Sequence, residues 1–172
     1  MRNSTSGADS NPARTRPGMS WGVKHSFTRY IDAMPDGRRG AAHGATETER
    51  GVYFFELDGA SDYDPVSGGG VIRYRGDVRY AGHGGMLFVM IVDPWIEFRG
   101  PTAVLTVLDA EHWPKREHRI ELATLALDES ATQQLPDRWA HLTARLTQEG
   151  SSVFNDVYPV GEILEPVKYC TA

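Results

Sequence analysis

Three residues of this chain have side chains that could bind a ligand: Tyr30 in the stretch SWGVKHSFTRYI, His83 in YAGHGGML and Tyr158 in FNDVYPVGEILEPV. Glycines flank His83 on both sides, and residues without a side chain allow either a sharp backbone turn or the close approach of a flat ligand. The pattern alone leaves open whether His83 is a turn histidine or faces a ligand. For Tyr30 the alternative is a core tyrosine whose hydroxyl has a partner.

Other motifs in the sequence give weaker indications of a functional site. The stretch SGGGV lacks the Lys-Ser/Thr pair of a phosphate loop and is typical of a β-turn. His112 and His118 have glutamates beside them in EHWPKREH, but the Pro-Lys-Arg between them is typical of a solvated hairpin tip rather than a metal site. There is no G-x-S-x-G motif, and no spacing of Ser, His and Asp suggests a catalytic triad. None of these patterns requires an enzyme.

The composition limits the possible partners. A chain of 172 residues with 40% hydrophobic content can form one domain with one core. The formal net charge of -5 and the lack of a basic run argue against a nucleic-acid partner. Cys170 is the single cysteine, so there is no internal disulfide and no cysteine-rich zinc site. The apolar run MLFVMIV is far shorter than the roughly 20 residues of a membrane helix, so we expect no membrane insertion.

The N-terminal segment differs from the rest of the chain. Residues 1–18 are polar, rich in Ser, Pro, Arg and Asn, and contain no apolar run of the length that a signal peptide needs. We expect residues 1–18 to be a disordered tail and residues 19–172 to form the single domain. The chain as written has no recognisable leader or anchor, so we expect a cytoplasmic protein.

The residues around Tyr30 have helical periodicity. Apolar side chains recur at spacings near three and four, at Trp21, Val23, Phe27, Tyr30 and Ile31. Ser20 can cap the first turn, and the Pro-Asp-Gly that follows Met34 ends the pattern. The sequence therefore predicts a helix over residues 20–34, with Tyr30 facing inward and its hydroxyl in need of a partner.

Most of the remaining chain has strand patterns. The runs GVYFFEL, MLFVMIVDPWIEFRG, TAVLTVLDA and HRIELATLAL are rich in β-branched and aromatic residues and are separated by Gly, Pro or Asp. In residues 68–85 the apolar side chains share one parity and the arginines the other, which predicts one apolar and one solvated face. The apolar set is Ile72, Tyr74, Val78 and Tyr80, and the polar set is Arg73, Arg75 and Arg79.

A second helix is predicted for PDRWAHLTARLTQEG. Trp139, Leu142 and Leu146 would share one face of this helix, and Gly150 would end it. The order of these elements predicts a mainly β fold, an antiparallel β-sandwich-like domain with one N-terminal helix and one later helix.

Several of these stretches together resemble the HtaA domain, the haem-binding module of actinobacterial haem-uptake proteins. They are WGVKHSFTRYI, FFELDGASDYDPVSGGGVIRYRGDVRYAGHGGML, DPWIEFRGPTAVLTV and GSSVFNDVYPVGEILEPV. The resemblance runs in order from about Ser20 to Val167. Each motif alone is weak, but their co-occurrence in this order is distinctive.

The resemblance implies a β-rich fold that binds ferric haem, as haem b, through an axial tyrosine supported by a histidine. Carried over by motif, Tyr30 is the axial ligand of the haem iron, His83 is the supporting histidine and Tyr158 is a second tyrosine of the pocket. A phenol ordinarily titrates at a pH of about 10, so binding as phenolate needs the ferric ion and a hydrogen-bond partner. The row of arginines at 73, 75 and 79 either pairs with the propionates or simply faces solvent.

The resemblance also implies a function. It is that of a non-catalytic haem-binding protein for haem uptake, transport or buffering, with another haem carrier or a transporter as a candidate partner. Members of the family are mostly exported or anchored at the cell surface, so a chain without leader or anchor fits an intracellular carrier, buffer or sensor better. Two alternatives remain: an interaction module of the same fold that does not bind haem, and a haem-dependent enzyme such as a degradase.

Overall fold

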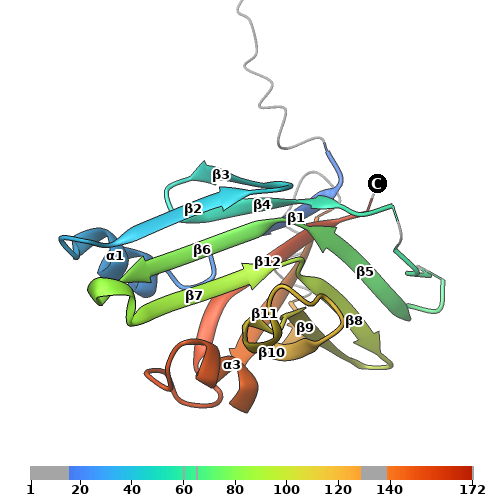
Figure 1. The fold of residues 1–172 in the computed structure, drawn as a ribbon. Coiled ribbons are helices and arrows are strands. Elements are labelled where there is room, and N and C mark those ends of the chain that lie inside the picture. The colour runs from blue at the N-terminus through green and yellow to red at the C-terminus, as the bar shows by residue number, and fades with distance from the viewer. Residues whose placement is uncertain (1–15, 60, 65, 129–138, 172) are drawn as a thin grey trace, which may run out of the picture.

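The computed structural model describes residues 16–59, 61–64, 66–128 and 139–171. Most of the described secondary structure is strand, every strand pairing within it is antiparallel, and the described α-helices are α1 (His25–Ala33) and α3 (Gln148–Val153). The predicted fold class, mainly β and antiparallel with one early and one later helix, is confirmed (Figure 1).

The larger sheet closes on itself. Its order is β1-β12-β11-β10-β9-β8-β5-β4-β3, and β1 also pairs with β4, so that β1 lies between β12 and β4. The strands are β1 (Gly18–Trp21), β3 (Ala45–Glu49), β4 (Val52–Leu57), β5 (Gly70–Arg75), β8 (Trp95–Arg99), β9 (Thr102–Leu108), β10 (Arg119–Leu127), β11 (Ala140–Leu146) and β12 (Ile163–Cys170). The strands of this sheet contribute most of the residues of the main hydrophobic core.

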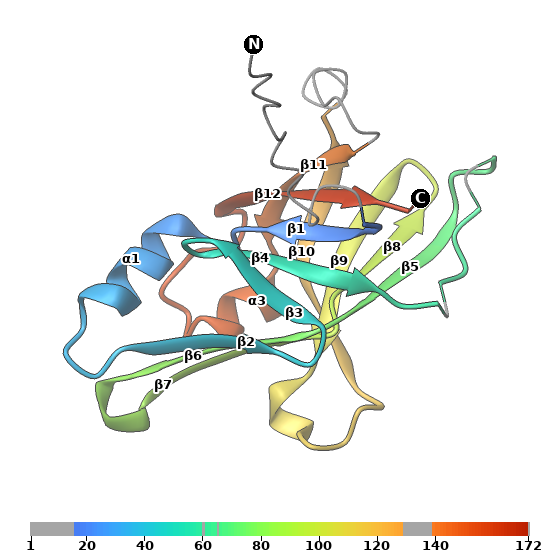
Figure 2. The same cartoon turned by 90° about the horizontal axis from the view of Figure 1, so that it is seen from above.

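A smaller sheet, in the order β2-β6-β7, extends from the closed sheet (Figure 2). Its strands are β2 (Arg38–Ala42), β6 (Asp77–Gly82) and β7 (Leu87–Val92). The chain passes from β5 to β6 through Gly76 and from β7 to β8 through Asp93. Two hydrogen bonds join these connections. The Asp93 N–H donates to the Gly76 carbonyl at 2.8 Å, and the Gly76 N–H donates to the Asp93 carboxylate at 3.0 Å.

The alternation predicted for residues 68–85 is confirmed, although its two halves belong to different sheets. The apolar set is fully buried, at Ile72, Tyr74, Val78 and Tyr80. The arginines of the other parity are ion-paired, Arg73 with Asp62, Arg75 with Glu56 and Arg79 with Asp77. A continuous β pattern in the sequence therefore does not reveal that the strand bends from one sheet into the other.

The first helix begins later than the sequence predicts. Ser20 and Trp21 belong to β1, and Lys24 is the N-cap residue, with no side-chain capping bond. Val23 has a φ of +56°, a left-handed conformation that a helix cannot contain. Trp21 is held in the sheet, because its Nε1 donates to the Glu165 carbonyl at 2.8 Å. The predicted end is confirmed, with Met34 as the C-cap residue.

The second predicted helix is wrong over most of its length. Residues 136–138 lie outside the described residues, and Trp139 leads directly into strand β11. In β11 the buried side chains, Leu142, Ala144 and Leu146, alternate with exposed ones, a period of two that also fits a strand. The helix α3 begins only after this strand. Thr147 caps it by accepting the Gly150 N–H at 2.9 Å, and Gly150 lies buried within it.

Two further expectations concern the ends of the chain and the membrane. Residues 1–15 of the expected tail lie outside the described residues, whereas Gly18, which we placed in that tail, is the first residue of β1. Within the described ranges, no helix has both the length and the apolar character needed to span a bilayer.

Candidate functional site

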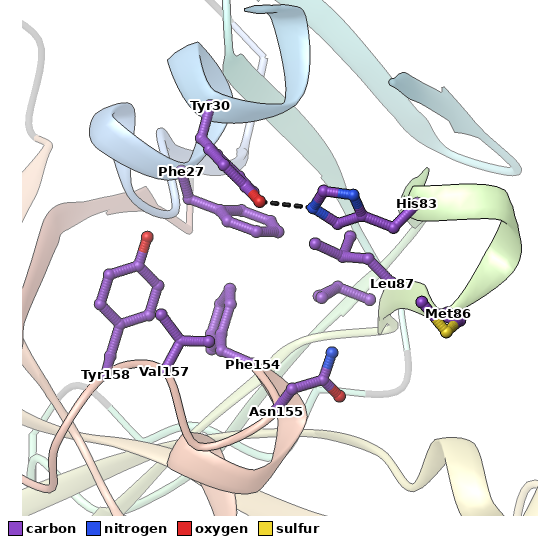
Figure 3. A pocket seen from close by; sticks show the side chains of 10 residues that line it. Phe27, Tyr30, His83, Met86, Leu87, Phe154, Asn155, Val157 and Tyr158 are labelled. Atoms are coloured by element: carbon purple, nitrogen blue, oxygen red, sulfur yellow. Dashed lines mark hydrogen bonds between the residues drawn. The ribbon is translucent and has the colours of Figure 1, made fainter. Parts of the chain in front are cut away.

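A pocket of about 380 Å³ lies between α1, the turn that joins β6 to β7, and the segment that follows α3 (Figure 3). Its volume is in the range of small-molecule sites, roughly 300 to 1,000 Å³. The lining is mainly apolar and consists of Phe27, Tyr30, His83, Met86, Leu87, Val89, Phe154, Asn155, Val157 and Tyr158. The fold therefore brings the three predicted site residues to one cavity from three distant parts of the chain.

Tyr30 and His83 form a direct hydrogen bond. The Tyr30 hydroxyl lies 2.5 Å from His83 Nε2, across the opening between α1 and the β6–β7 turn. Tyr30 is 47% exposed and lines the pocket, so the alternative of a core tyrosine is wrong. In the tautomer with a free Nε2 the phenol donates to the imidazole, which can thus receive the phenol proton.

The turn that carries His83 has an unusual backbone. His83, Gly84 and Gly85 form the short 3-10 turn η2 (His83–Gly85), with φ values of +50°, +63° and +92°. Glycine adopts this left-handed region at little cost, but a histidine there needs support from its surroundings. His83 is thus a turn histidine whose ring also lines the pocket, and its role toward a ligand stays a prediction.

Aromatic rings form the inner wall of the pocket. Phe27 is 4% exposed and Phe154 is 2% exposed, and their rings pack edge to face with centroids 5.2 Å apart. Tyr158 packs against both of them, at 6.4 Å from Phe27 and 5.7 Å from Phe154. The sequence pattern did not identify Phe154 as a pocket residue, because Phe154 and Tyr158 lie after the end of α3, where no helical spacing relates them.

Tyr158 lies on the opposite wall from His83 (Figure 3). Its ring lies 5.0 Å from Lys24 Nζ, and this ammonium also donates to Glu162 Oε1 at 2.9 Å. The Tyr158 carbonyl accepts a hydrogen bond from Ser151 Oγ at 2.5 Å. Both the ring and the backbone of Tyr158 are thus fixed by neighbours outside the pocket.

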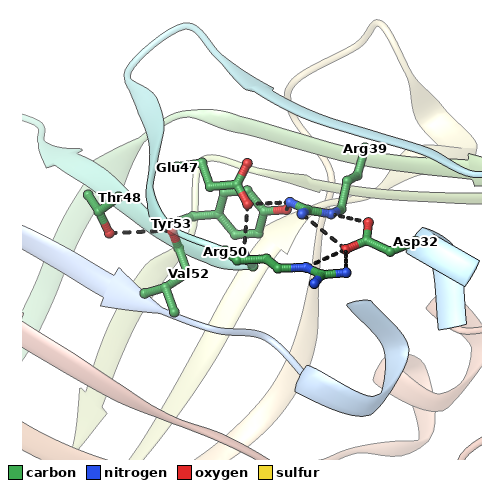
Figure 4. A network of polar contacts seen from close by, with 8 residues as sticks. Asp32, Arg39, Glu47, Thr48, Arg50, Val52 and Tyr53 are labelled. Carbon is green, nitrogen blue, oxygen red and sulfur yellow. Dashed lines mark hydrogen bonds and ion pairs between the residues drawn. The ribbon is translucent and has the colours of Figure 1, made fainter. Parts of the chain in front are cut away.

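The opposite side of α1 is held by charged groups (Figure 4). Arg39 on β2 donates from Nε to Asp32 Oδ1 at 2.7 Å, bonds Glu47, and donates to the Tyr53 hydroxyl at 3.1 Å. Arg50 adds a bond to the second oxygen of Asp32 at 3.0 Å. The hydrogen bond from Arg39 lowers the pKa of Asp32 below its usual value, with a further contribution from Arg50. We call these five residues the back-face network.

The other candidates from the sequence lie elsewhere. The arginines at 73, 75 and 79 are ion-paired outside this pocket, so their assignment to propionates gains no support. The rings of His112 and His118 stack with centroids 4.0 Å apart, and His112 Nδ1 lies 2.6 Å from Asp109. Among the described residues, no group of three or more His, Cys, Asp or Glu side chains is placed to hold a metal ion.

The pocket combines two chemical features. Its aromatic and aliphatic walls suit a flat apolar molecule, because they offer large surfaces that lose contact with water on binding. At its edge, one phenol oxygen is paired with an imidazole that can take the proton. Such an oxygen donor, once deprotonated, is a hard anionic ligand for ferric iron.

Comparisons with known proteins place this arrangement in context. The HtaA family model matches residues 17–169 of the chain. The crystal structure of the C-terminal domain of HtaA from Corynebacterium glutamicum is 26% identical, with a TM-score of 0.70 over 90% of this chain and 95% of that domain. No curated protein sequence matches the chain.

Two other solved structures share the fold at lower identity. The haem-binding protein HtaB from Corynebacterium glutamicum is 19% identical, with a TM-score of 0.66 over 88% of this chain and 90% of that one. The N-terminal domain of HtaA from the same organism is 20% identical, with a TM-score of 0.67 over 90% of this chain and 96% of that domain.

Proposed function

Because the chain belongs to the HtaA family, we propose that it is a haem-binding protein in which Tyr30 is the axial ligand of ferric haem iron. The observation that carries this proposal is the 2.5 Å hydrogen bond between the Tyr30 hydroxyl and His83 Nε2 at the edge of an apolar pocket. The similarity in fold to a protein described as haem-binding, HtaB, supports the proposal.

The residues of the pocket fit haem b. A porphyrin is broad, flat and largely apolar, and the exposed parts of Tyr30, Met86 and Val157 offer it apolar surface. The buried rings of Phe27 and Phe154 pack beneath this surface. Tyr30 would hold the iron, and Tyr158 would contact the macrocycle from the wall opposite His83. Haem when bound supplies a ferric centre, whose charge favours an anionic oxygen ligand.

His83 has a separate task in this proposal. A free phenol is almost fully protonated at neutral pH, because its pKa is about 10. A hydrogen bond from the imidazole to the phenolate stabilises the anion and lowers the cost of deprotonation. His83 would thus act on the ligand without binding iron itself, as partners of metal ligands commonly do.

The first experiment is a titration of the purified protein with hemin. We expect saturable binding with a Soret band and the charge-transfer absorption of a high-spin tyrosinate complex. Tyr30→Phe should remove the charge-transfer band and weaken binding by at least about 100-fold, because it deletes the bond to iron. Tyr63→Phe is the matched control, since Tyr63 is a partly buried tyrosine that packs on Phe98, away from the pocket. Unsaturable binding by the wild type would refute the proposal.

The redox state of the iron provides a second test. A phenolate is a hard, charged donor and favours Fe(III) over Fe(II). Reduction with dithionite should therefore release haem faster, which can be followed by transfer to an apo-globin acceptor. Equal affinity in both redox states would argue against tyrosine ligation while leaving haem binding in place.

The biological role proposed here is non-catalytic. The protein would carry or buffer haem and exchange it with another haem carrier or a transporter. Exposed apolar side chains at the pocket, Met86 at 85% and Val157 at 71%, leave the ligand accessible from outside. With a reductant system and oxygen, full recovery of intact haem in a globin acceptor would support a carrier, whereas loss of total haem with formation of a cleavage product would support a degradase.

A further inference from the structure

One carboxylate links the helix that carries Tyr30 to the turn that carries His83. Asp36 lies in the segment that follows α1, and its two oxygens accept separate backbone hydrogen bonds from that turn. The His83 N–H donates to Oδ1 at 3.3 Å, and the Gly84 N–H donates to Oδ2 at 2.7 Å. Because the segment is continuous with α1, any displacement of the turn relative to Tyr30 must stretch one of these bonds.

The turn needs such a partner. Both His83 and Gly84 have left-handed φ values, of +50° and +63°, and the N–H groups of both residues point at one carboxylate. Consecutive N–H groups in this arrangement form a small concave site for an anion. Asp36 provides that anion and thereby offsets the strain of holding a histidine in this conformation.

An apolar contact also joins the segment after α1 to the end of β6. A β-carbon at Gly82 would lie 2.7 Å from Met34 Cε and 3.0 Å from its sulfur, so Met34 fills the space beside the residue before His83. The segment after α1 therefore contacts Gly82 at the end of β6 and, next to it, the turn that carries His83. Met34 sets how closely they approach, and the Asp36 carboxylate sets how the turn is oriented.

We infer that Asp36 is the positioning residue of this site, which fixes the β6–β7 turn so that His83 Nε2 reaches the Tyr30 hydroxyl. This inference rests on the proposed function for its consequence in haem binding, but the geometry it describes belongs to the protein without ligand. Asp36 touches neither the pocket nor Tyr30, and it acts through the backbone of His83 and Gly84. The Gly84 N–H also holds the pKa of Asp36 below its ordinary value.

A matched control exists elsewhere in the chain. Asp64 also accepts two backbone hydrogen bonds within a turn, from the Val66 N–H at 2.9 Å and the Ser67 N–H at 3.3 Å. Both carboxylates are exposed, and both have a pKa lowered mainly by a backbone N–H. Asp64→Ala thus removes the same kind of bond at a site that does not contact the pocket.

The first readout needs no haem. In ¹H–¹⁵N spectra of the ligand-free protein, the Gly84 amide should resonate downfield, as expected for a hydrogen bond to a carboxylate. Asp36→Ala should shift this amide upfield and speed its hydrogen exchange by at least about tenfold, and Asp36→Asn should give an intermediate result because one acceptor oxygen remains. Asp64→Ala should leave the Gly84 amide unchanged. A Gly84 amide that is insensitive to Asp36→Ala would overturn the inference.

The second readout uses the ferric hemin complex. Asp36→Ala should weaken the tyrosinate charge-transfer band and raise the hemin dissociation rate about tenfold, the lower end of what outer partners of a metal ligand contribute. Asp36→Asn should restore part of both signals, and Asp64→Ala should change neither. If Asp36→Ala and Asp64→Ala alter the band and the rate equally, the role is general stability and the inference fails. If the wild type does not bind hemin, the proposed function fails, and the Gly84 amide still decides the role of Asp36.

Discussion

The two sides of α1 are built in opposite ways. The side that faces the pocket presents the half-exposed Tyr30, and one hydrogen bond to His83 holds the phenol in place. The other side presents Asp32, which two arginines bind through both of its oxygens. Ion pairs on the Asp32 side thus hold the helix in place, and the Tyr30 side remains available to contact a ligand.

The helix needs this support because it is weak by itself. It has nine residues, no side-chain capping bond, no acidic residue in its first turn and no basic residue in its last. A helix this short is unstable in isolation, and its stability must come from tertiary contacts. Burial of Phe27, Thr28 and Ile31 supplies the apolar part, and the back-face network defined above supplies the polar part.

Among the changes that separate the two sides of α1, Arg39→Met should have the largest effect, a loss of folding stability. This substitution leaves the carboxylates of Asp32 and Glu47 without their shared partner, and the Arg39 side chain is only 14% exposed. We expect a loss of about 2 kcal/mol in the free energy of unfolding, between the values for exposed and buried pairs, because Asp32 keeps Arg50 and the Glu47 side chain is 37% exposed. Urea unfolding followed by circular dichroism measures it. Hemin affinity of the folded fraction should change little.

The control for Arg39 is Arg75→Met. Arg75 pairs with Glu56 at 2.7 Å, but its side chain is 61% exposed, so removing it should cost less than about 1 kcal/mol. If both variants unfolded at the same urea concentration, the back-face network would not be the anchor of α1.

The next largest effect concerns hemin binding at the side of α1 that carries Tyr30. His83→Ala should weaken hemin binding by about 10- to 100-fold and move formation of the tyrosinate band to higher pH, because the phenolate loses its hydrogen-bond partner. The urea midpoint should stay within error, since the His83 side chain is exposed. His118→Ala, at another exposed histidine, should bind hemin like the wild type. A large loss of stability in His83→Ala would mean that the two sides of α1 are not separable.

A smaller effect is expected on the acid stability of the fold, through Asp32. The pKa of Asp32 is lowered in the folded protein, mainly by its hydrogen bond to Arg39, so it stabilises the fold above its unfolded pKa of about 4. This contribution is lost as the pH falls through the lower, folded pKa. Asp32→Asn should therefore cost about 1 kcal/mol at pH 7 and make unfolding less dependent on pH below about 4. Unchanged acid unfolding in this variant would show that other carboxylates control it.

The sequence predicted the members of the pocket better than the elements that carry them. Tyr30, His83 and Tyr158 line one cavity, as the resemblance implied, although their roles toward haem stay predictions. Strand alternation was readable because side-chain parity does not depend on which sheet a strand joins. The sequence pattern could not predict that Tyr30 lies at a surface pocket, because an apolar helix face has the same residue spacing whether another element or a ligand covers it.

Two errors share one physical cause. Trp21 fits a helical stripe, yet it pairs with Tyr53 and Val167 in β1, and Leu142 and Leu146 fit both a helical spacing of four and a strand spacing of two. Spacings of four satisfy both periods, so tertiary pairing decides between them. Asp36 was read only as part of a helix stop, because its hydrogen bonds reach a turn that is distant in sequence.

The smallest expected effect belongs to Tyr158→Phe. This variant keeps the ring, and with it the packing on Phe154 at 5.7 Å and the contact with the Lys24 ammonium at 5.0 Å. Hemin affinity should fall less than about threefold, the value of at most one exposed hydrogen bond. Tyr158→Ala should cost more, because it removes the wall itself.

The same variant can also reverse the ligand assignment. Tyr158 and Tyr30 both line the pocket, so a phenolate from either side could in principle reach an iron between them. Only Tyr30 has an imidazole nitrogen at 2.5 Å to receive its proton, which is why the larger effect is expected there. If Tyr158→Phe removed the tyrosinate band while Tyr30→Phe kept it, the ligand would be Tyr158. Haem binding would stand, but the His83 hydrogen bond would then serve to hold α1 rather than to activate a ligand.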